Sequence, residues 1–254
     1  MRTIIAVAAA ALLAITPAKA ADLTLLVGGS MTTVFKQVGA RFAQNTGNKL
    51  DYVFDTTGAL QKRLRSGETA DIILVSAQGM DQLDHEHLIL AGSQTEIAIA
   101  TIGVSVRKGA ASPDLSTTDA FKRAMLAAHS IALVDPKAGG TSGIYLDTLF
   151  QRLGIAADVK RKAVWGNQGS QIADAVASGK AELGLTFISE MLPNKAVQIA
   201  GPLPAEIQSP TAYVVAIPAS SMHPQEARAF LAAVTSQSVW PVIRKAGLTP
   251  ATKK

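Results

Sequence analysis

The sequence contains no cysteine among its 254 residues. Disulfide bridges, thiol nucleophiles and thiolate metal sites are therefore excluded, and the fold must depend on its packed core. Aromatic residues make up only 5% of the chain, and the formal net charge of +5 is small for this length. Both values argue against nucleic-acid binding, although a mild positive charge helps to attract a small anion.

Motifs of several common catalytic sites are also missing. The chain has no H-E-x-x-H, no G-x-S-x-G and no G-x-x-x-x-G-K-[ST] pattern. The sequence Asp84-His85-Glu86-His87 invites a metal interpretation. Positions i and i+2 of a helix do not share a face, however, so an exposed helix end is the better interpretation. We expect neither a metal nor a cofactor.

Residues 1–20 have the pattern of a secretory signal peptide. Arg2 is a positive n-region, positions 4–15 form an apolar run, and Ala18-Lys19-Ala20 is a small-x-small cleavage site. We predict cleavage after Ala20 and export to a bacterial periplasm. A membrane anchor is the less favoured alternative, because the apolar run is too short for a stable span. The remaining chain is long enough for two lobes of about 100 residues each.

Apolar strands alternate with helices in the first part of the mature chain. Strands are predicted at 23–27, 50–54 and 71–75, and a helix follows each of them, the third at 80–90. This order indicates a parallel sheet with helices on its faces. In such sheets ligands bind beyond the carboxyl ends of the strands.

The second part of the chain repeats this order of elements. A strand at 131–134 precedes a loop of glycine and hydroxyl residues at 135–143, and a helix follows. Extended segments near 96–107 and 201–217 are predicted to join two α/β units, and the last two helices to return to the first unit. We predict one lobe from 21–101 plus 214–254 and a second lobe from 102–213.

Hydroxyl side chains stand where predicted strands pass into helices. Ser30 and Thr57 do so in the first lobe, and Thr141 and Ser142 in the second. Helix N-termini carry free N–H groups and about half a positive charge, so these loops favour an oxyanion or a carboxylate. Each hydroxyl alone is better explained as an ordinary helix N-cap. The recurrence of the pattern favours binding.

Arg107 ends the extended segment that leads into the second lobe. A guanidinium group at this position could form a bidentate pair with a ligand carboxylate. A solvated charge at the end of a strand is an equally good explanation.

Several segments together resemble the type II periplasmic solute-binding proteins, in the branch of the molybdate-binding proteins. The matching segments are Leu26-Val27-Gly28-Gly29-Ser30-Met31, Asp55-Thr56-Thr57-Gly58-Ala59-Leu60, Ala70-Asp71-Ile72, Asp135-Pro136, Gly184-Leu185-Thr186-Phe187-Ile188-Ser189 and Gly247-Leu248-Thr249-Pro250. The resemblance covers the mature chain. It implies an α/β fold of two lobes, each a mostly parallel sheet with helices on both faces, with a two-strand hinge and the ligand between the lobes.

The resemblance also implies a set of ligand-binding residues. They are Ser30, the loop of Thr56, Thr57 and Gly58, the loop of Gly140, Thr141 and Ser142, and Ser189. Molybdate binders usually carry a Tyr-x-Ser-Asp pattern where this chain has Phe187-Ile188-Ser189-Glu190. The glycine-rich loop is similar to that of a sub-branch that includes carboxylate binders and periplasmic aconitate isomerases. A di- or tricarboxylate therefore competes with molybdate as the ligand, and Arg107 would suit it.

Two functions fit these features. The favoured one is a monomeric receptor that closes over a small anion and delivers it to an inner-membrane ABC permease. The alternative is an isomerase that interconverts cis- and trans-aconitate, for which a general base must reach an acidic C–H bond. The loops contain no histidine, and Lys137 or Glu190 would be a speculative choice of base. The lack of a clear base favours the receptor. A binding module that serves a sensor is a third possibility.

Overall fold

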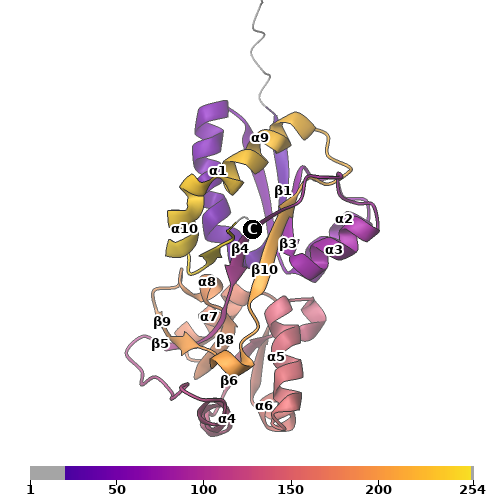
Figure 1. The fold of residues 1–254 in the computed structure, drawn as a ribbon. Coiled ribbons are helices and arrows are strands. Elements are labelled where there is room, and N and C mark those ends of the chain that lie inside the picture. The colour runs from indigo at the N-terminus through magenta and orange to yellow at the C-terminus, as the bar shows by residue number, and fades with distance from the viewer. Residues whose placement is uncertain (1–20, 253–254) are drawn as a thin grey trace, which may run out of the picture.

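The structure is a computed structural model that describes residues 21–252, so the predicted signal peptide lies outside the described residues. The described chain forms two α/β lobes, drawn one above the other in Figure 1. This confirms the two-lobed α/β fold. Among the described residues, no helix combines the length and the apolar character needed to cross a membrane.

The first lobe is built on a six-stranded sheet. In spatial order its strands are β11 (Thr249–Pro250), β4 (Thr95–Ala100), β10 (Thr211–Ala216), β3 (Ile72–Ser76), β1 (Asp22–Gly28) and β2 (Lys49–Asp55). The helices of this lobe are α1 (Thr32–Thr46), α2 (Thr57–Arg65), α3 (Ala77–His85), α9 (Pro224–Thr235) and α10 (Trp240–Lys245), with the short 3-10 helices η1 (Gly29–Met31) and η4 (Gln237–Val239).

Helix α9 returns to the first lobe because its apolar face packs on α1. The Phe230 ring lies 5.2 Å from Phe42 and 5.8 Å from Phe35, measured between ring centroids. All three side chains are buried. The close packing of α1 and α9 is visible in Figure 1, and it places α9 against the first lobe.

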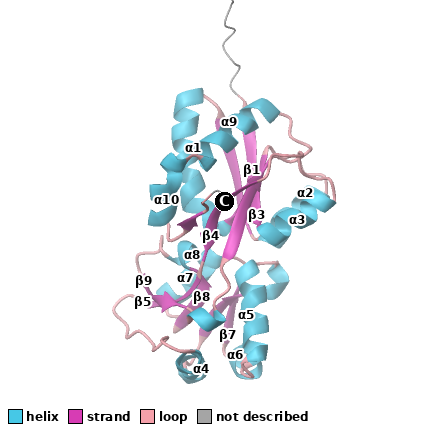
Figure 2. Ribbon diagram, viewed as in Figure 1, coloured by secondary structure: helices cyan, strands magenta, loops and turns pink. Residues whose placement is uncertain are grey.

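The second lobe is built on a five-stranded sheet. In spatial order its strands are β7 (Ala163–Gly166), β6 (Ile131–Val134), β8 (Leu183–Phe187), β5 (Ile102–Arg107) and β9 (Val197–Pro202). The helices are α4 (Thr118–Ala127), α5 (Thr141–Arg152), α6 (Ala156–Arg161), α7 (Gly169–Ala177) and α8 (Ile188–Met191), with the 3-10 helices η2 (Pro136–Ala138) and η3 (Ala205–Ile207). Figure 2 shows helices on both sides of these strands.

Both sheets are mixed, so they contain more antiparallel strand pairs than the expected mostly parallel sheets. Strands β1, β2 and β3 are parallel, as are β6, β7 and β8. The strands that carry the chain between the lobes, β4, β5, β9 and β10, add to these parallel cores in antiparallel fashion. A chain that returns across the same hinge must run in the opposite direction, which explains the mixed order.

The chain crosses between the lobes twice. The extended segment predicted near 96–107 is two strands, because β4 ends at Ala100 in the first sheet and β5 begins at Ile102 in the second. The return crossing leads from β9 to β10, and β10 lies wholly in the first sheet from Thr211 onward. The second crossing therefore precedes the predicted limit at 213.

The third helix is shorter than the predicted 80–90. It begins at Ala77 and ends at His85. His87 has a positive φ of 56°, which a continuing α-helix does not allow, and Ile89 then pairs with Pro218. The apolar residues at the end of the predicted helix belong instead to the strand-like connection that follows.

Candidate ligand-binding site

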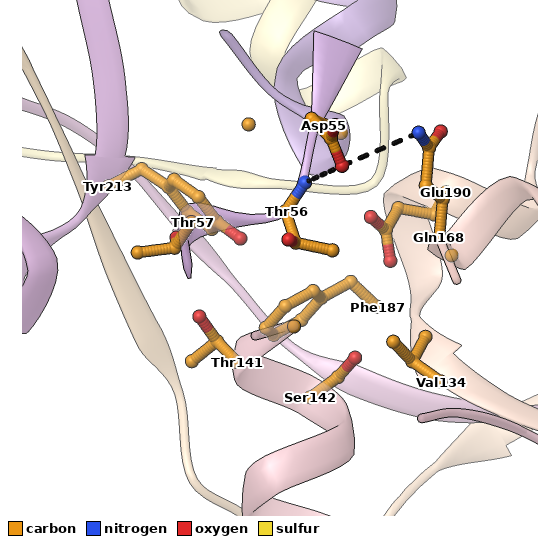
Figure 3. A pocket seen from close by; sticks show the side chains of 14 residues that line it. Asp55, Thr56, Thr57, Val134, Thr141, Ser142, Gln168, Phe187, Glu190 and Tyr213 are labelled. Carbon is orange, nitrogen blue, oxygen red and sulfur yellow. Dashed lines mark hydrogen bonds between the residues drawn. The ribbon is translucent and has the colours of Figure 1, made fainter. Parts of the chain in front are cut away.

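A small cavity of about 20 Å³ lies between the two lobes and is lined by residues of both. Figure 3 shows Thr56 and Thr57 of the first lobe facing Thr141 and Ser142 of the second across it. The lining residues are Gly28, Gly29, Asp55, Thr56, Thr57, Val134, Gly140, Thr141, Ser142, Gln168, Gly169, Phe187, Glu190 and Tyr213. Most of them stand just beyond the carboxyl end of a strand, where the sequence places the polar loops.

Three helices begin at this cavity. Thr57, Thr141 and Gly169 are the first residues of α2, α5 and α7, and all three line it. Gly29, the first residue of η1, lines it as well. The first N–H groups of a helix have no partner within the helix, so these termini supply donors and partial positive charge from both lobes. The arrangement suits an anion that is held by backbone donors and not by a cationic side chain.

The two lobes touch directly beside the cavity. The Thr56 hydroxyl donates a hydrogen bond of 2.5 Å to the carbonyl of Ala138, and the Gly58 N–H donates one of 3.1 Å to the carbonyl of Gly139. The Gln168 side-chain amide of the second lobe donates to the Phe54 carbonyl of the first at 3.4 Å. These bonds join loops of the two lobes directly, so the lobes are closed on each other in this structure.

Glu190 brings a carboxyl group into this closed site. Its side chain is partly exposed because it faces the cavity, yet protein atoms surround it on the other sides. Burial raises the pKa of Glu190 to about 7, although hydrogen bonds from Thr186 and from the backbone of Phe187 oppose the rise. The Thr186 hydroxyl donates to the carboxyl at 2.6 Å. A carboxyl with such a pKa is able to accept and release a proton near neutral pH.

A second hydroxyl extends the hydrogen bonds of Glu190 towards helix α5. The Ser142 hydroxyl lies 3.0 Å from the Thr186 hydroxyl, and both are buried. Ser142 lines the cavity. A continuous chain of hydrogen bonds therefore runs from the start of α5 through Thr186 to Glu190.

Tyr213 closes the first-lobe side of the cavity. Its hydroxyl lies 3.0 Å from the Ser30 hydroxyl, and its ring packs edge-on against Phe187 at 6.0 Å between centroids. Burial, together with the nearby Glu190 carboxylate, raises the pKa of Tyr213 above its usual range. Phe187 has no hydroxyl, and the tyrosine hydroxyl of this site comes from Tyr213 on β10 of the first lobe.

Most of the residues expected in the site lie at or next to the cavity. Thr56, Thr57, Gly140, Thr141 and Ser142 line it. Two more lie in a second layer. Ser30 is 2% exposed and holds the Tyr213 hydroxyl, while Gly58 forms part of the contact between the lobes.

Arg107 and Ser189 do not line the cavity. Strand β5 runs antiparallel to β8, with Ile102 opposite Phe187, so β5 starts near the cleft and Arg107 ends it at the far side of the lobe. There Arg107 is exposed and lies beside Gly179. Ser189 is buried beside Gly247, and its hydroxyl has no hydrogen-bond partner within the described residues. Their assignment to the ligand-binding site therefore has no support from the lining of this cavity.

Asp55, Gln168 and Tyr213 line the cavity although no sequence pattern singles them out, and the sequence suggests Glu190 only as a speculative base. Asp55 and Gln168 stand in polar loops, but nothing local separates them from the caps and turns around them. Tyr213 sits in an otherwise apolar strand, which is typical of core. The lining residues include no lysine or arginine, and residues 21–252 contain no cluster of acidic, histidine or cysteine side chains that could hold a metal ion.

Known proteins match both the sequence and the fold. The model of the bacterial extracellular solute-binding protein family matches residues 23–249. An aconitate isomerase from Pseudomonas sp is 33% identical over 251 residues, which cover 95% of this chain and 94% of that protein. A putative ABC transporter substrate-binding lipoprotein from Bacillus subtilis is 27% identical over 77% of this chain and 74% of its own length.

The structural comparison supports the same fold. The periplasmic molybdate-binding protein of Azotobacter vinelandii superposes with a TM-score of 0.74 at 21% identity, covering 92% of this chain and all of that one. The match of the family model spans both lobes and every residue of the cavity. The chain therefore belongs to the bacterial extracellular solute-binding protein family.

Proposed function

We propose that this protein closes its two lobes over a small carboxylate anion in the periplasm. The convergence of the N-termini of α2, α5 and α7 on one cavity carries this proposal. Each terminus offers free N–H groups and a partial positive charge, which together stabilise an anion without a cationic side chain. The anion bridges the lobes, because α2 belongs to the first lobe and the other two helices to the second.

The apolar part of the lining favours a carboxylate over a bare oxyanion. Val134 and Phe187 line the same cavity as the hydroxyl residues. The carbon skeleton of a carboxylate can pack against these apolar side chains. Molybdate or sulfate presents oxygen atoms on every side, and the oxygens that face Val134 and Phe187 would receive no hydrogen bond from these side chains. The 33% identity to an aconitate isomerase points to the same class of ligand.

A receptor for an ABC permease in the inner membrane is the simplest role for such a site. Family membership supports it, and so does the similarity to a putative ABC transporter substrate-binding lipoprotein. Ligand contacts to both lobes would favour the closed form, so the permease would meet the loaded receptor in that form.

A thermal-shift assay tests the ligand class. The protein without residues 1–20 is heated with cis-aconitate, trans-aconitate, citrate, sulfate, molybdate or tungstate. Carboxylates are expected to raise the Tm, because a ligand that binds only the folded state stabilises it. Stabilisation by molybdate and tungstate but by no carboxylate would contradict the proposal.

Isomerisation of aconitate is the second candidate function, and Glu190 is the observation that favours it. A receptor does not need a carboxyl group beside its anion, since the two repel each other once both are ionised. An enzyme that moves a double bond needs a general base beside its ligand, and a carboxyl group can be that base, because a proton must leave one carbon and return to another. Glu190, with its pKa raised to about 7, suits this task.

Conversion of the substrate tests the second candidate directly. The purified protein is incubated with cis-aconitate, and the trans isomer is followed by proton NMR until the ratio becomes constant. The same ratio is expected from either isomer as the starting material. If neither isomer is converted while both raise the Tm, the protein is a receptor alone.

A further inference from the structure

We propose that Glu190 is the catalytic base of this site and that Thr186, held by Ser142, is the residue that positions its carboxyl group. The proposal deepens the second candidate function and rests on it. It assigns the proton transfer to one carboxyl group and names the hydrogen bonds that hold this group in place.

The carboxyl group stands where a ligand at the helix N-termini would touch it. An added Cβ at Gly29 would lie 2.8 Å from Glu190 Oε1, and one at Gly169 would overlap the carboxyl group. Glu190 thus lies against η1 of the first lobe and against the start of α7 in the second. A ligand that accepts hydrogen bonds from these two backbone segments has its carbon atoms beside the carboxyl group.

The hydrogen bonds fix which oxygen faces the ligand. Thr186 donates its single hydroxyl proton to Glu190 Oε2, so towards Ser142 it can act only as an acceptor. The two bonds orient the carboxyl group and favour its ionised form, which is the form that acts as a base. Oε1 lies on the Gly29 side and receives no side-chain hydrogen bond within the described part of the chain.

The groups around Glu190 keep its proton exchangeable. Tyr213 from β10 and Asp55 from β2 are the other titratable side chains that line the cavity. Neither carries a positive charge, and among residues 21–252 no lysine or arginine lines the cavity to hold Glu190 permanently ionised. Burial accordingly raises the pKa of Glu190 to about 7. Near neutral pH the group can take a proton and also return it.

The reaction needs no further reagent. The C–H bond of the ligand's methylene group breaks, and the proton forms an O–H bond with Glu190 Oε1. The electron pair spreads over the three allylic carbons and the adjacent carboxylates, where the helix N-termini stabilise the extra charge. Glu190 then returns the proton to the far allylic carbon, and the double bond has moved. The atoms balance, and nothing is oxidised or reduced.

The test compares Glu190→Gln with Glu206→Gln, an exposed glutamate on η3 that serves as the matched control. Turnover of cis-aconitate and uptake of deuterium from D₂O into the ligand are followed by NMR. Glu190→Gln is expected to lower both rates by about 10²–10⁴-fold, the usual contribution of a general base. The Tm shift with cis-aconitate is expected to persist in both variants, because the glutamine keeps the shape of the side chain.

Thr186→Val tests the positioning role through the pH profile. The substitution removes the Thr186 hydroxyl and with it a hydrogen bond that lowers the pKa of Glu190. The pH at which the rate reaches half of its maximum is therefore expected to rise. A purely structural role would lower the rate without changing this pH. Such a result would refute the role of Thr186.

Failure of the inference differs from failure of the proposed function. If the wild type turns over aconitate and Glu190→Gln does so at a similar rate, the base is another group and the isomerase function stands. If the wild type shows neither turnover nor exchange of deuterium, both are refuted. If the wild type exchanges deuterium without forming the other isomer and Glu190→Gln does not, the base assignment stands and the isomerase function falls.

Discussion

The Glu190 carboxyl group packs so closely against Gly169, the first residue of helix α7, that a methyl group at position 169 would overlap it. Glycine at this position therefore does more than begin a helix. It lets an acidic side chain lie at a helix N-terminus inside the closed cleft, where the partial positive charge helps to balance the carboxylate. Burial nevertheless raises the pKa of Glu190 to about 7, against the hydrogen bonds from Thr186 and from the backbone of Phe187.

Gly169→Ala is predicted to push the Glu190 carboxyl group out of its place. Any isomerase activity is expected to fall by at least about tenfold, because a small misplacement of a catalytic group is costly. Ser170→Ala changes the next, exposed residue and is the control. Steady-state rates with cis-aconitate measure the effect, and equal rates in the two variants would show that the contact does not matter.

The stability of the protein is predicted to depend on Glu190 and on pH. Folding keeps the proton on this carboxyl up to a pH of about 7, above the range of an ordinary carboxyl. The contribution of the Glu190 proton to the free energy of unfolding is therefore complete at low pH, and it is lost as the pH rises through about 7. The Tm of Glu190→Gln relative to the wild type should rise by several degrees between about pH 5 and about pH 8.

Differential scanning calorimetry without ligand measures this trend. Glu206→Gln, which changes an exposed glutamate, is the matched control. A constant difference in Tm between Glu190→Gln and the wild type over this range would mean that folding does not hold a proton on Glu190.

The Ser30–Tyr213 hydrogen bond is predicted to stabilise the first lobe near the hinge. Removing either hydroxyl leaves the other buried without this partner, at a cost of about 1–3 kcal/mol. Tyr213→Phe, Ser30→Ala and the double variant together form a double-mutant cycle, read by urea denaturation. The double variant is expected to lose clearly less free energy of unfolding than the sum of the losses in the two single variants. Additive costs would contradict the pairing, and the exposed Thr33→Ala serves as the control.

The contact between the lobes is predicted to depend on Gly58. An added Cβ there would lie 2.9 Å from the Cα of Gly139, which itself has a positive φ of 73°. Overpacking of this kind costs about 1–3 kcal/mol in the closed form, so Gly58→Ala should weaken ligand binding by roughly tenfold. Gly201→Ala is the control, because an added Cβ at that position would make only an ordinary contact at 3.5 Å.

Small-angle X-ray scattering with saturating ligand shows whether the lobes close. The wild type and Gly201→Ala are expected to become more compact on binding, and Gly58→Ala to do so less. If Gly58→Ala becomes as compact as the wild type, the added methyl group is accommodated between Gly58 and Gly139 without opposing closure.

The sequence was informative where a side chain acts within its own strand–loop–helix unit. Thr57, Thr141 and Ser142 follow predicted strands, and the geometry of such units alone places them at the carboxyl edge of a sheet. The alternation of strands and helices also predicts the two lobes, because each strand and helix has its own local pattern of apolar residues.

The sequence was not informative where position depends on partners far along the chain. Arg107 ends a strand, but which end of the sheet it reaches depends on the antiparallel pairing of β5 with β8. Tyr213 enters the site because β10 crosses back to the first sheet beside β3. Glu190 acquires its raised pKa from residues of both lobes that enclose it. No local pattern encodes such burial.

A crystal structure of Glu190→Gln with cis-aconitate tests the central claim most directly. The claim predicts the ligand between the lobes, with carboxylate oxygens within hydrogen-bond distance of backbone N–H groups at Thr141 and Gly169 and with its methylene carbon beside the side chain at position 190. A ligand bound through Arg107, or one that touches only one lobe, would contradict it.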